Sequence, residues 1–352
     1  MATAKSAKRS ANAFHLIPAM HARAPGWLRT LSRMAPPAVF TAAHLALFLV
    51  LWPNTREDVV LRGFLQLSFH DSGRVLAGAV PYRDFLLEYP PGTLLFMLAP
   101  RIFAVGFLSY RTLFFVEAAL LDTAIVVTLY AIARSARLPA TRVLAFYTIA
   151  IVAIGPLTAY RLDLAPAALT VLGVLAWQRK RPALAAAALA AGAATKIYPL
   201  LLLPPLIMDQ WVQGRARRAP AAILAFAVTL AVFLSPALLA GADGLTRALR
   251  FQTERNLQVE SIWATPPLLL HLTTGFALHI EAMGRALVIL GPGNALGQAG
   301  TPALAIVALV TYWLWWRLRR RSDVRGATLL IGTALLVFAA ATLNKVLSPQ
   351  YM

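Results

Sequence analysis

Residues 70–92, HDSGRVLAGAVPYRDFLLEYPPG, gather ionisable side chains in a chain that is otherwise mostly apolar. The stretch contains two Asp, one Glu, two Arg and one His. Its three prolines and three glycines predict turns and short elements rather than one long helix or strand. A carboxylate in such a loop can accept the proton of an attacking hydroxyl, and basic side chains can hold an anion. This stretch is therefore the first candidate for a chemical site.

A second candidate is a lone lysine between two apolar segments. Lys196 stands in TKIYP (195–199), where Pro199 interrupts helix hydrogen bonding. An ammonium group in lipid is costly, so this side chain is either paired, functional or extended to the surface. We expect the chain to turn back at 195–199, which places Lys196 on the same side as residues 70–92.

The composition indicates a membrane protein. Of 352 residues, 59% are hydrophobic and 13% are charged, and the mean hydropathy is +0.67. A soluble protein of this size could not bury so much apolar surface, so lipid must cover part of it. Apolar runs rich in Leu, Ala and Val predict an all-α polytopic membrane protein.

The net charge of +19 has a distribution that excludes nucleic-acid binding as its explanation. Twenty of the 33 Lys and Arg residues lie in five short tracts, 1–35, 134–142, 178–182, 213–219 and 317–325. Basic residues confined to short loops between apolar runs place those loops in the cytoplasm. The chain has no cysteine, which excludes disulfides, thiolate catalysis and Cys metal sites.

The apolar runs predict about nine transmembrane helices. They are expected at 36–52, 112–133, 143–158, 163–178, twice within 183–212, and at 220–240, 301–316 and 326–343. A cytoplasmic basic tail, 1–35, would precede one transmembrane domain, 36–352. The sequence stops just after an outward-facing motif, which leaves open whether the chain is truncated at Met352.

Two larger outer regions connect these spans. The first outer loop, 53–111, includes the apolar segment 93–107, which is expected to lie at the membrane surface. Its 15 residues would cover about 22 Å as a helix, less than the bilayer core of about 30 Å. In the second outer region, 241–300, residues 266–300 are expected to form interfacial or re-entrant helices.

Several motifs in order along the chain resemble one enzyme superfamily. They are HDSGRVLAGAVPYRDFLLEYPPG (70–92), YRLDLAPAALTVLGVLAW (160–177), AGAATKIYPLLLLPPL (191–206), and the pair RNLQVESIWATP (255–266) and NKVLSPQY (344–351). Their order and spacing resemble the GT-C membrane glycosyltransferases. The most similar group is glycosyltransferase family 87, which comprises polyprenyl-phosphate-mannose-dependent mannosyltransferases and uncharacterised bacterial relatives. The resemblance implies a GT-C-like fold with interfacial helices in the first outer loop.

The resemblance places the catalytic base, an outer-loop Asp, at Asp71. The alternative is that Asp71 caps a helix starting at Ser72. Asp84 and Glu88 are rival bases, or they brace the PYRDFLLEYPP turn through Arg83. Tyr82 and Tyr89 of the same turn are expected to shape the site.

The donor phosphate requires cations at the outer membrane boundary. The matched basic residues are Lys196, Arg255, Arg161 and Lys345. Arg161 is alternatively a partner of Asp163, and Arg255 a solvated loop charge. Gln258 and Glu260 are expected on the acceptor side. The scattered histidines indicate no metal site, and no cofactor is expected beyond the polyprenyl-phosphate sugar as co-substrate.

The expected function is sugar transfer from a polyprenyl-phosphate donor to a glycolipid or glycan acceptor. The sugar would be mannose or another hexose or pentose, and the site would face outward from the plasma membrane. One alternative is a transporter or lipid flippase that uses Glu117, Asp122 and Lys196 as a polar path. Another is a structural subunit of an envelope complex. The sequence leaves the oligomeric state open.

Overall fold

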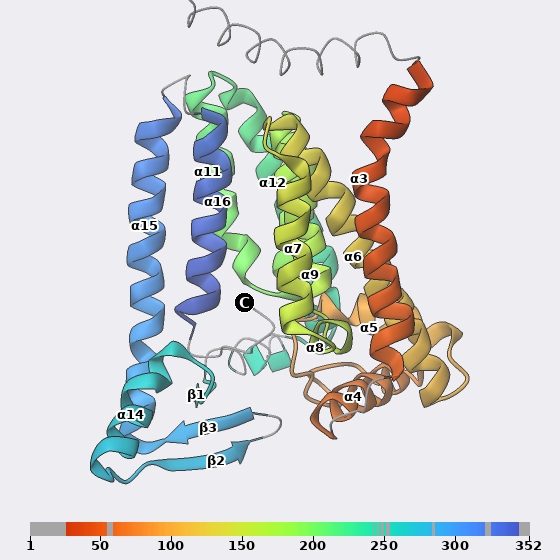
Figure 1. Cartoon of the computed structure of the whole chain (residues 1–352). Helices are drawn as coiled ribbons and strands as arrows, with labels where there is room; N and C mark the ends of the chain where they lie inside the picture. Colours follow the sequence, from red (N-terminus) through yellow and green to blue (C-terminus); the bar gives the residue numbers. More distant parts are fainter. Residues whose placement is uncertain are drawn as a thin grey trace, which may run out of the picture.

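The structure is a computed structural model, and it is dominated by helices packed side by side (Figure 1). It describes residues 26–54, 59–241, 254–283, 286–320 and 325–344, with positions 243, 244, 246, 247 and 250. The bundle helices are α3 (Gly26–Ala46), α6 (Phe107–Ser135), α7 (Ala140–Ile154), α9 (Leu164–Gln178), α10 (Pro182–Thr195), α11 (Leu203–Val212), α12 (Ala219–Leu239), α15 (Gly300–Arg319) and α16 (Arg325–Thr342). The mostly helical architecture expected from the apolar runs is therefore confirmed.

Four helical segments of the described chain are long and apolar enough to cross a bilayer. They are Ala35–Asn54, Phe107–Ser135, Ala216–Leu239 and Gly291–Arg319. Five further apolar helices are shorter, with 10–17 residues. These include α7, α9, α10 and most of α16, which coincide with expected spans, and α5 (Thr93–Phe103), which coincides with the expected interfacial segment.

Described residues of four basic tracts, 134–142, 178–182, 213–219 and 317–325, lie at one end of the bundle, the upper end in Figure 1. Three contacts between the turns show this. Ser135 Oγ donates to Gln178 Oε1 over 2.7 Å, Arg218 Nη1 donates to the Lys180 carbonyl over 3.4 Å, and Arg319 forms an ion pair with Asp209. We call this the basic end.

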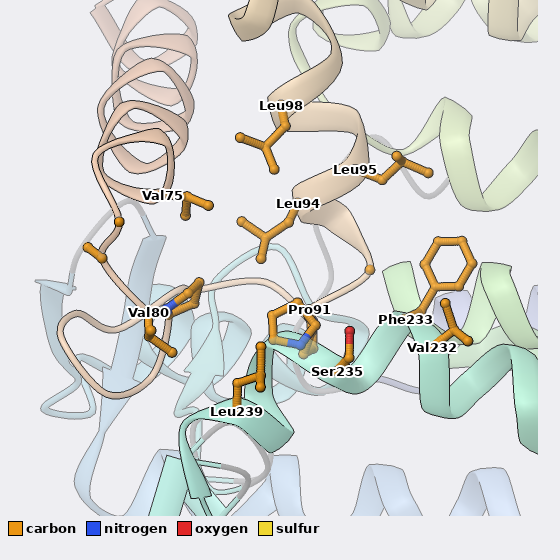
Figure 2. A pocket seen from close by; sticks show the side chains of 15 residues that line it. Val75, Val80, Pro91, Leu94, Leu95, Leu98, Val232, Phe233, Ser235 and Leu239 are labelled. Atoms are coloured by element: carbon orange, nitrogen blue, oxygen red, sulfur yellow. The ribbon is translucent and has the colours of Figure 1, made fainter.

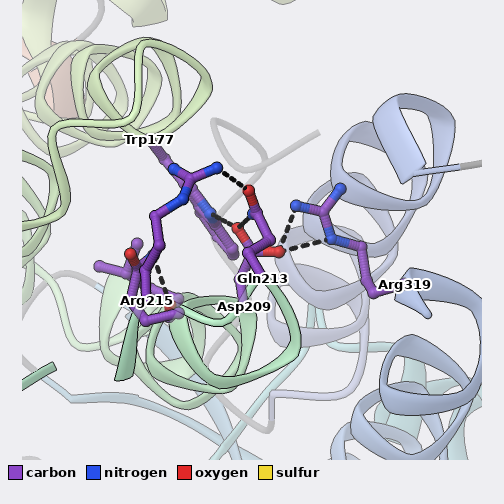
Figure 3. A network of polar contacts seen from close by, with 7 residues as sticks. Trp177, Asp209, Gln213, Arg215 and Arg319 are labelled. Carbon is purple, nitrogen blue, oxygen red and sulfur yellow. Dashed lines mark hydrogen bonds and ion pairs between the residues drawn. The ribbon is translucent and has the colours of Figure 1, made fainter. Parts of the chain in front are cut away.

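A buried polar network braces the basic end (Figure 3). Asp209 of α11 and Arg319 of α15 are 1% and 3% exposed. Trp177 Nε1 donates to Asp209 over 2.8 Å, and the Trp177 ring stacks on Trp315 with centroids 5.2 Å apart. An enclosed charge needs such partners because it has lost water, and here they tie α9, α11 and α15 together.

The chain reverses between α10 and α11, as the TKIYP motif predicts. Helix α10 ends at Thr195, and Lys196 is extended, with φ −159° and ψ 129°. A short 3-10 helix, η3 (Tyr198–Leu202), then leads into α11. Since Asp209 of α11 returns to Trp177 at the basic end, the chain has turned back.

The opposite end of the bundle carries the irregular elements (lower part of Figure 1). They are α4 (Val59–Leu76), α5, α8 (Leu157–Tyr160), the short 3-10 helices η5 (Ile262–Ala264) and η6 (Gly291–Ala299), α14 (Thr265–Thr274) and three strands. We call this the loop end. It contains the 70–92 stretch, which therefore lies away from the basic turns.

The strands correct the all-helical expectation. Strands β1 (Leu257–Gln258), β2 (His279–Met283) and β3 (Ala286–Leu290) form an antiparallel sheet in the order β1-β3-β2. Residues 279–283 and 286–290 are thus strands rather than the interfacial or re-entrant helices expected there. Leu257 and Ile289, which are paired in register, are both fully buried and form a small core with Ala264.

Candidate functional site

A cavity of about 290 Å³ opens at the loop end, where five segments distant in sequence meet. Its walls are the 88–90 segment, the start of α9, the residues that follow α10, Arg255 and the end of α16. The side chains that give it chemical character are those of Glu88, Tyr89, Asp163, Lys196, Arg255 and Asn344. We call it the polar pocket.

Lys196 and Asp163 form an ion pair in the wall of the polar pocket. Their side chains are 18% and 22% exposed, so both are largely removed from water but not enclosed. Burial lowers the pKa of Lys196, and the charge of Asp163 opposes that shift. Asp163 is the residue before α9, yet it makes no side-chain capping hydrogen bond. Its carboxylate is directed to Lys196 instead.

The segment carrying Glu88 is held in place by backbone contacts. The Gly92 N–H donates to the Ala194 carbonyl at 2.9 Å. A Cβ at Gly92 would lie 2.7 Å from the Ala194 backbone, so only glycine permits this approach. Arg255 Nη2 donates to the Glu88 carbonyl at 3.3 Å. Glu88 therefore lines the pocket from an anchored main chain.

Tyr82 is hydrogen-bonded to the same segment. Its hydroxyl donates to the Tyr89 carbonyl at 2.5 Å, and its side chain is 2% exposed. Its φ of 67° lies in the left-handed region, which a tyrosine adopts at a cost. The buried hydrogen bond explains why this position is a tyrosine; the site-shaping role of Tyr82 stays a prediction.

Arg161 contacts two aromatic side chains, Phe64 and Tyr89, of which Tyr89 lines the polar pocket. Its guanidinium lies 4.9 Å from the centroid of the Phe64 ring, and its Nη1 donates to the Tyr89 hydroxyl at 3.5 Å. Burial raises the pKa of Tyr89, and nearby Arg161 opposes the shift. The sequence also offers Arg161 as a partner of Asp163, but Asp163 forms its ion pair with Lys196.

Asp71 is placed apart from this constellation. It is the thirteenth residue of α4, so the alternative that it caps a helix starting at Ser72 is wrong. It is 4% exposed and shares the buried face of α4 with Phe64 and Ser68. It lines neither of the two described pockets.

Asp84 closes a turn, as the bracing interpretation of the PYRDF segment predicts. It accepts from the Val80 N–H at 2.7 Å and pairs with Arg83 at 2.9 Å. The hydrogen bond from Arg83 is the main reason that the pKa of Asp84 falls to about 2. Such a carboxylate is a poor proton acceptor at neutral pH.

The predicted acceptor-side residues lie outside the polar pocket. Gln258 is 8% exposed in strand β1, and Glu260 is exposed in the turn that follows. Lys345 falls outside the described residues, so its expected role stays a prediction.

The segment 261–263 is hydrogen-bonded to the residues that follow α16. Ser261 Oγ donates to the Asn344 carbonyl at 2.9 Å, and Trp263 Nε1 donates to the Leu343 carbonyl at 2.8 Å. The RNLQVESIWATP and NKVLSPQY motifs therefore meet beside Asn344, which lines the polar pocket.

Asp163 is the member of the site that the sequence reasoning missed. It precedes Lys180 by 17 positions, and Lys196 follows Lys180 by 16. With the turn of the α9–α10 pair at Lys180, these nearly equal sequence separations place Asp163 and Lys196 at about the same level. That symmetry is the sequence signal that could have identified the pair.

An apolar pocket of about 520 Å³ lies on the other side of the 90–92 turn. Leu94, Leu95 and Leu98 of α5 face Val232, Phe233 and Leu239 of α12 across it (Figure 2). Pro91 and Gly92 belong to its wall, whereas Pro90 belongs to the wall of the polar pocket. The two pockets are thus separated by a single turn.

The polar side chains of the transport alternative do not form one path. Asp122 is fully buried, where it bonds His44 Nδ1 and the Tyr147 hydroxyl, each at 2.6 Å. These contacts join α3, α6 and α7, whereas Lys196 pairs with Asp163 at the loop end. Among the described residues, no group of three or more His, Asp or Glu side chains could hold a metal ion.

Comparison with known proteins identifies the family. No curated protein and no solved structure matches the chain. The sequence profile described as glycosyltransferase family 87 matches residues 85–342. The matched range includes Glu88, Asp163, Lys196 and Arg255, and it begins after Asp71. The chain therefore belongs to glycosyltransferase family 87, whose membership implies sugar transfer, and its apolar helices indicate a membrane protein.

Proposed function

We propose that this protein transfers a sugar from a polyprenyl-phosphate donor to a glycolipid or glycan acceptor at the outer membrane boundary. The observation that carries the proposal is the polar pocket, where Lys196 and Arg255 lie beside Glu88 and Asp163. Cations suit a phosphate that leaves with its charge, and a carboxylate suits a hydroxyl that must lose its proton. Mannose, another hexose or a pentose would be the transferred sugar.

The reaction would be a single displacement at the anomeric carbon. The acceptor oxygen forms a bond to that carbon while its proton passes to a carboxylate. The bond from the anomeric carbon to the phosphate oxygen breaks, and its electron pair leaves with the phosphate. Lys196 and Arg255 would hold the departing anion, and Arg161 would add positive charge behind Tyr89. Inversion at the anomeric carbon is the expected outcome.

We assign the proton acceptor to Glu88. Glu88 lines the same pocket as the cations, whereas Asp71 lines neither described pocket and is buried on α4. A base must reach the proton that it removes, so accessibility favours Glu88 over Asp71. Asp71 remains the competing assignment because the family resemblance points to it.

The apolar pocket suits the isoprenoid chain of the donor. It adjoins the polar pocket across the Pro90–Gly92 turn, and Val232 and Leu239 in its wall are also exposed on the outside of α12. A lipid chain could therefore enter sideways from the bilayer while its phosphate reaches Lys196. Because the pocket wall is as apolar as the lipid that the chain leaves, the chain could enter without exposing its surface to water.

The proposed topology follows from the two ends of the bundle. The basic end would be cytoplasmic, together with the N-terminal tail, by the positive-inside rule. The loop end would face outward from the plasma membrane, and about nine helices would cross the bilayer. Because the chain has no cysteine, the variants Asp84→Cys and Arg217→Cys each carry a single thiol. Each variant can be treated in whole cells with a maleimide that does not cross the membrane. Labelling at position 84 alone is expected; labelling at 217 alone would refute an outward site.

The activity test uses purified protein in nanodiscs with labelled polyprenyl-phosphate sugars. Lys196→Ala removes a charged contact with the phosphate, which is worth about 1.5–3 kcal/mol. The donor KM should therefore rise by about 10- to 150-fold. Lys180→Ala, at the basic end, is the matched control and should behave as wild type. If wild-type protein transfers sugar from no polyprenyl-phosphate donor but uses a nucleotide sugar, the proposed donor class is wrong.

A further inference from the structure

We propose that Asp163 is a positioning residue, whose carboxylate keeps the Lys196 ammonium charged and directed into the polar pocket before the donor arrives. The inference rests on the proposed function, because it assigns Lys196 to the donor phosphate. It concerns a residue for which neither the motifs nor the family match specify a role.

The geometry of the two helix ends supports this role. Asp163 precedes the N-terminus of α9, and Lys196 follows the C-terminus of α10. Helix dipoles stabilise a negative charge at the first position and a positive charge at the second. The antiparallel packing of α9 on α10 brings these two favourable positions together at the loop end.

The Asp163 carboxylate does not cap helix α9, although its position before the helix would allow it. An Asp before a helix usually accepts from the N–H groups of the first turn, but Asp163 makes no side-chain cap. Its partner is 33 residues away and lines a cavity. An ammonium has three donors, so Lys196 can bind a phosphate oxygen while it still contacts Asp163.

Without a carboxylate beside it, the partly buried Lys196 would lose its proton more easily. Burial already lowers the pKa of Lys196, and Asp163 is the main group that opposes this shift. Other charged or titratable groups also surround the pocket. They are Tyr89, Arg161, Glu88 and Arg255. Arg161 disfavours the ammonium and Tyr89 favours it, but among the groups that favour it the contribution of Asp163 is the largest.

The first experiment measures the protonation of Lys196 without any donor. Trace labelling with isotopic acetic anhydride at several pH values, read by mass spectrometry, reports the pKa of each lysine. Asp163→Asn should shift the labelling curve of Lys196 toward lower pH and leave that of Lys180 unchanged. Lys180 is exposed at the basic end and serves as the internal control. Superimposable Lys196 curves for the two proteins would overturn the inference.

The second experiment measures the donor KM between pH 6.5 and 9. Once the pH exceeds the pKa of Lys196, the charged fraction falls about tenfold per pH unit. Asp163→Asn should therefore raise the donor KM increasingly with pH, toward tenfold per unit, with little change in kcat at pH 6.5. The double variant Asp163→Asn/Lys196→Arg should lose this dependence, because a guanidinium stays charged. Asp163→Glu should restore much of the wild-type profile.

These outcomes separate the inference from the proposed function. If wild-type protein uses no polyprenyl-phosphate donor but the Lys196 labelling curve shifts, the proposed function fails and the charge-holding role of Asp163 stands. If wild-type protein transfers sugar and Asp163→Asn has a KM profile parallel to wild type, the inference fails alone. A uniform loss of kcat at every pH, with no change in the labelling curve, would assign Asp163 a merely structural role.

Discussion

Replacing Glu88 by glutamine tests where the proton of the acceptor goes. The substitution keeps the size of the side chain and removes its ability to accept a proton. The carbonyl of residue 88 would still accept from Arg255, because that contact at 3.3 Å uses the main chain. The pocket wall should therefore persist, and any loss of rate reports the chemistry of the carboxylate.

The expected loss of rate in Glu88→Gln follows from the proposed role of Glu88 as the general base. A positioned general base contributes about 10²- to 10⁴-fold to the rate, which corresponds to about 2.7–5.4 kcal/mol of transition-state stabilisation. Glu88→Gln should lower kcat by that factor. The donor KM should change little, because the cations that hold the phosphate, Lys196 and Arg255, are unaltered. The acceptor KM should also stay within a few-fold of wild type.

The assay compares initial rates of three variants in nanodiscs at saturating donor. Asp84→Asn is the matched control, since Asp84 lies four positions away in the same segment and serves a turn. Asp71→Asn tests the competing base. The assignment is refuted if Glu88→Gln keeps more than a tenth of the wild-type kcat while Asp71→Asn loses two or more orders of magnitude.

Three other perturbations address the scaffold. Arg319→Leu leaves Asp209 charged and enclosed, which should destabilise the fold by about 3–5 kcal/mol; a lowered midpoint of thermal unfolding in detergent would show it, and an unchanged midpoint would contradict it. Gly92→Ala adds a methyl group 2.7 Å from the backbone of α10 and should reduce transfer strongly, whereas Gly106→Ala, whose methyl group meets nothing within 4 Å, should not. Tyr82→Phe leaves a carbonyl of the pocket wall without its buried donor and should cost about 1–3 kcal/mol of stability, measurable by the same unfolding assay.

The helices were predictable because their signals are long and repeated. Apolar runs located most bundle helices within a few residues, although α3 begins at Gly26, well before the expected span at 36–52. TKIYP correctly predicted the reversal after Thr195. The turns at 134–142, 178–182 and 213–219, which the basic residues mark, lie at one end. Each of these inferences rests on long or repeated local patterns.

The strands were not predicted because the even number of membrane crossings required of residues 266–300 favoured helices over the local strand pattern. Residues 286–290, ALVIL, form a short apolar run bounded by turn residues, a pattern that also fits a strand. The need for an even number of crossings favoured helices over the whole of 266–300. The small sheet satisfies that need without any crossing, since β2 and β3 pair as neighbours at the loop end.

The assembly of the site was only partly visible in the sequence. Lys196 and Arg255 were identified as cations, and the structure places both at the polar pocket. Which carboxylate accompanies them depends on how α4 and the 88–92 segment pack. Asp71 and Glu88 are both carboxylates of the 70–92 stretch, and their burial and their place relative to the pocket are visible only in the structure.

Two ion pairs among the described residues differ in exposure, and the difference supports the proposal that the chemistry takes place at the loop end. Asp209 and Arg319 are enclosed, and their side chains are 1% and 4% exposed. Enclosure suits a brace, because Arg319 and Trp177 both donate to the Asp209 carboxylate from neighbouring helices. Asp163 and Lys196 have the same opposite charges but face a cavity, with 22% and 18% of their side chains exposed. A pair that must accept a phosphate needs that opening, since a fully committed ammonium could bind an anion only after losing its existing partners.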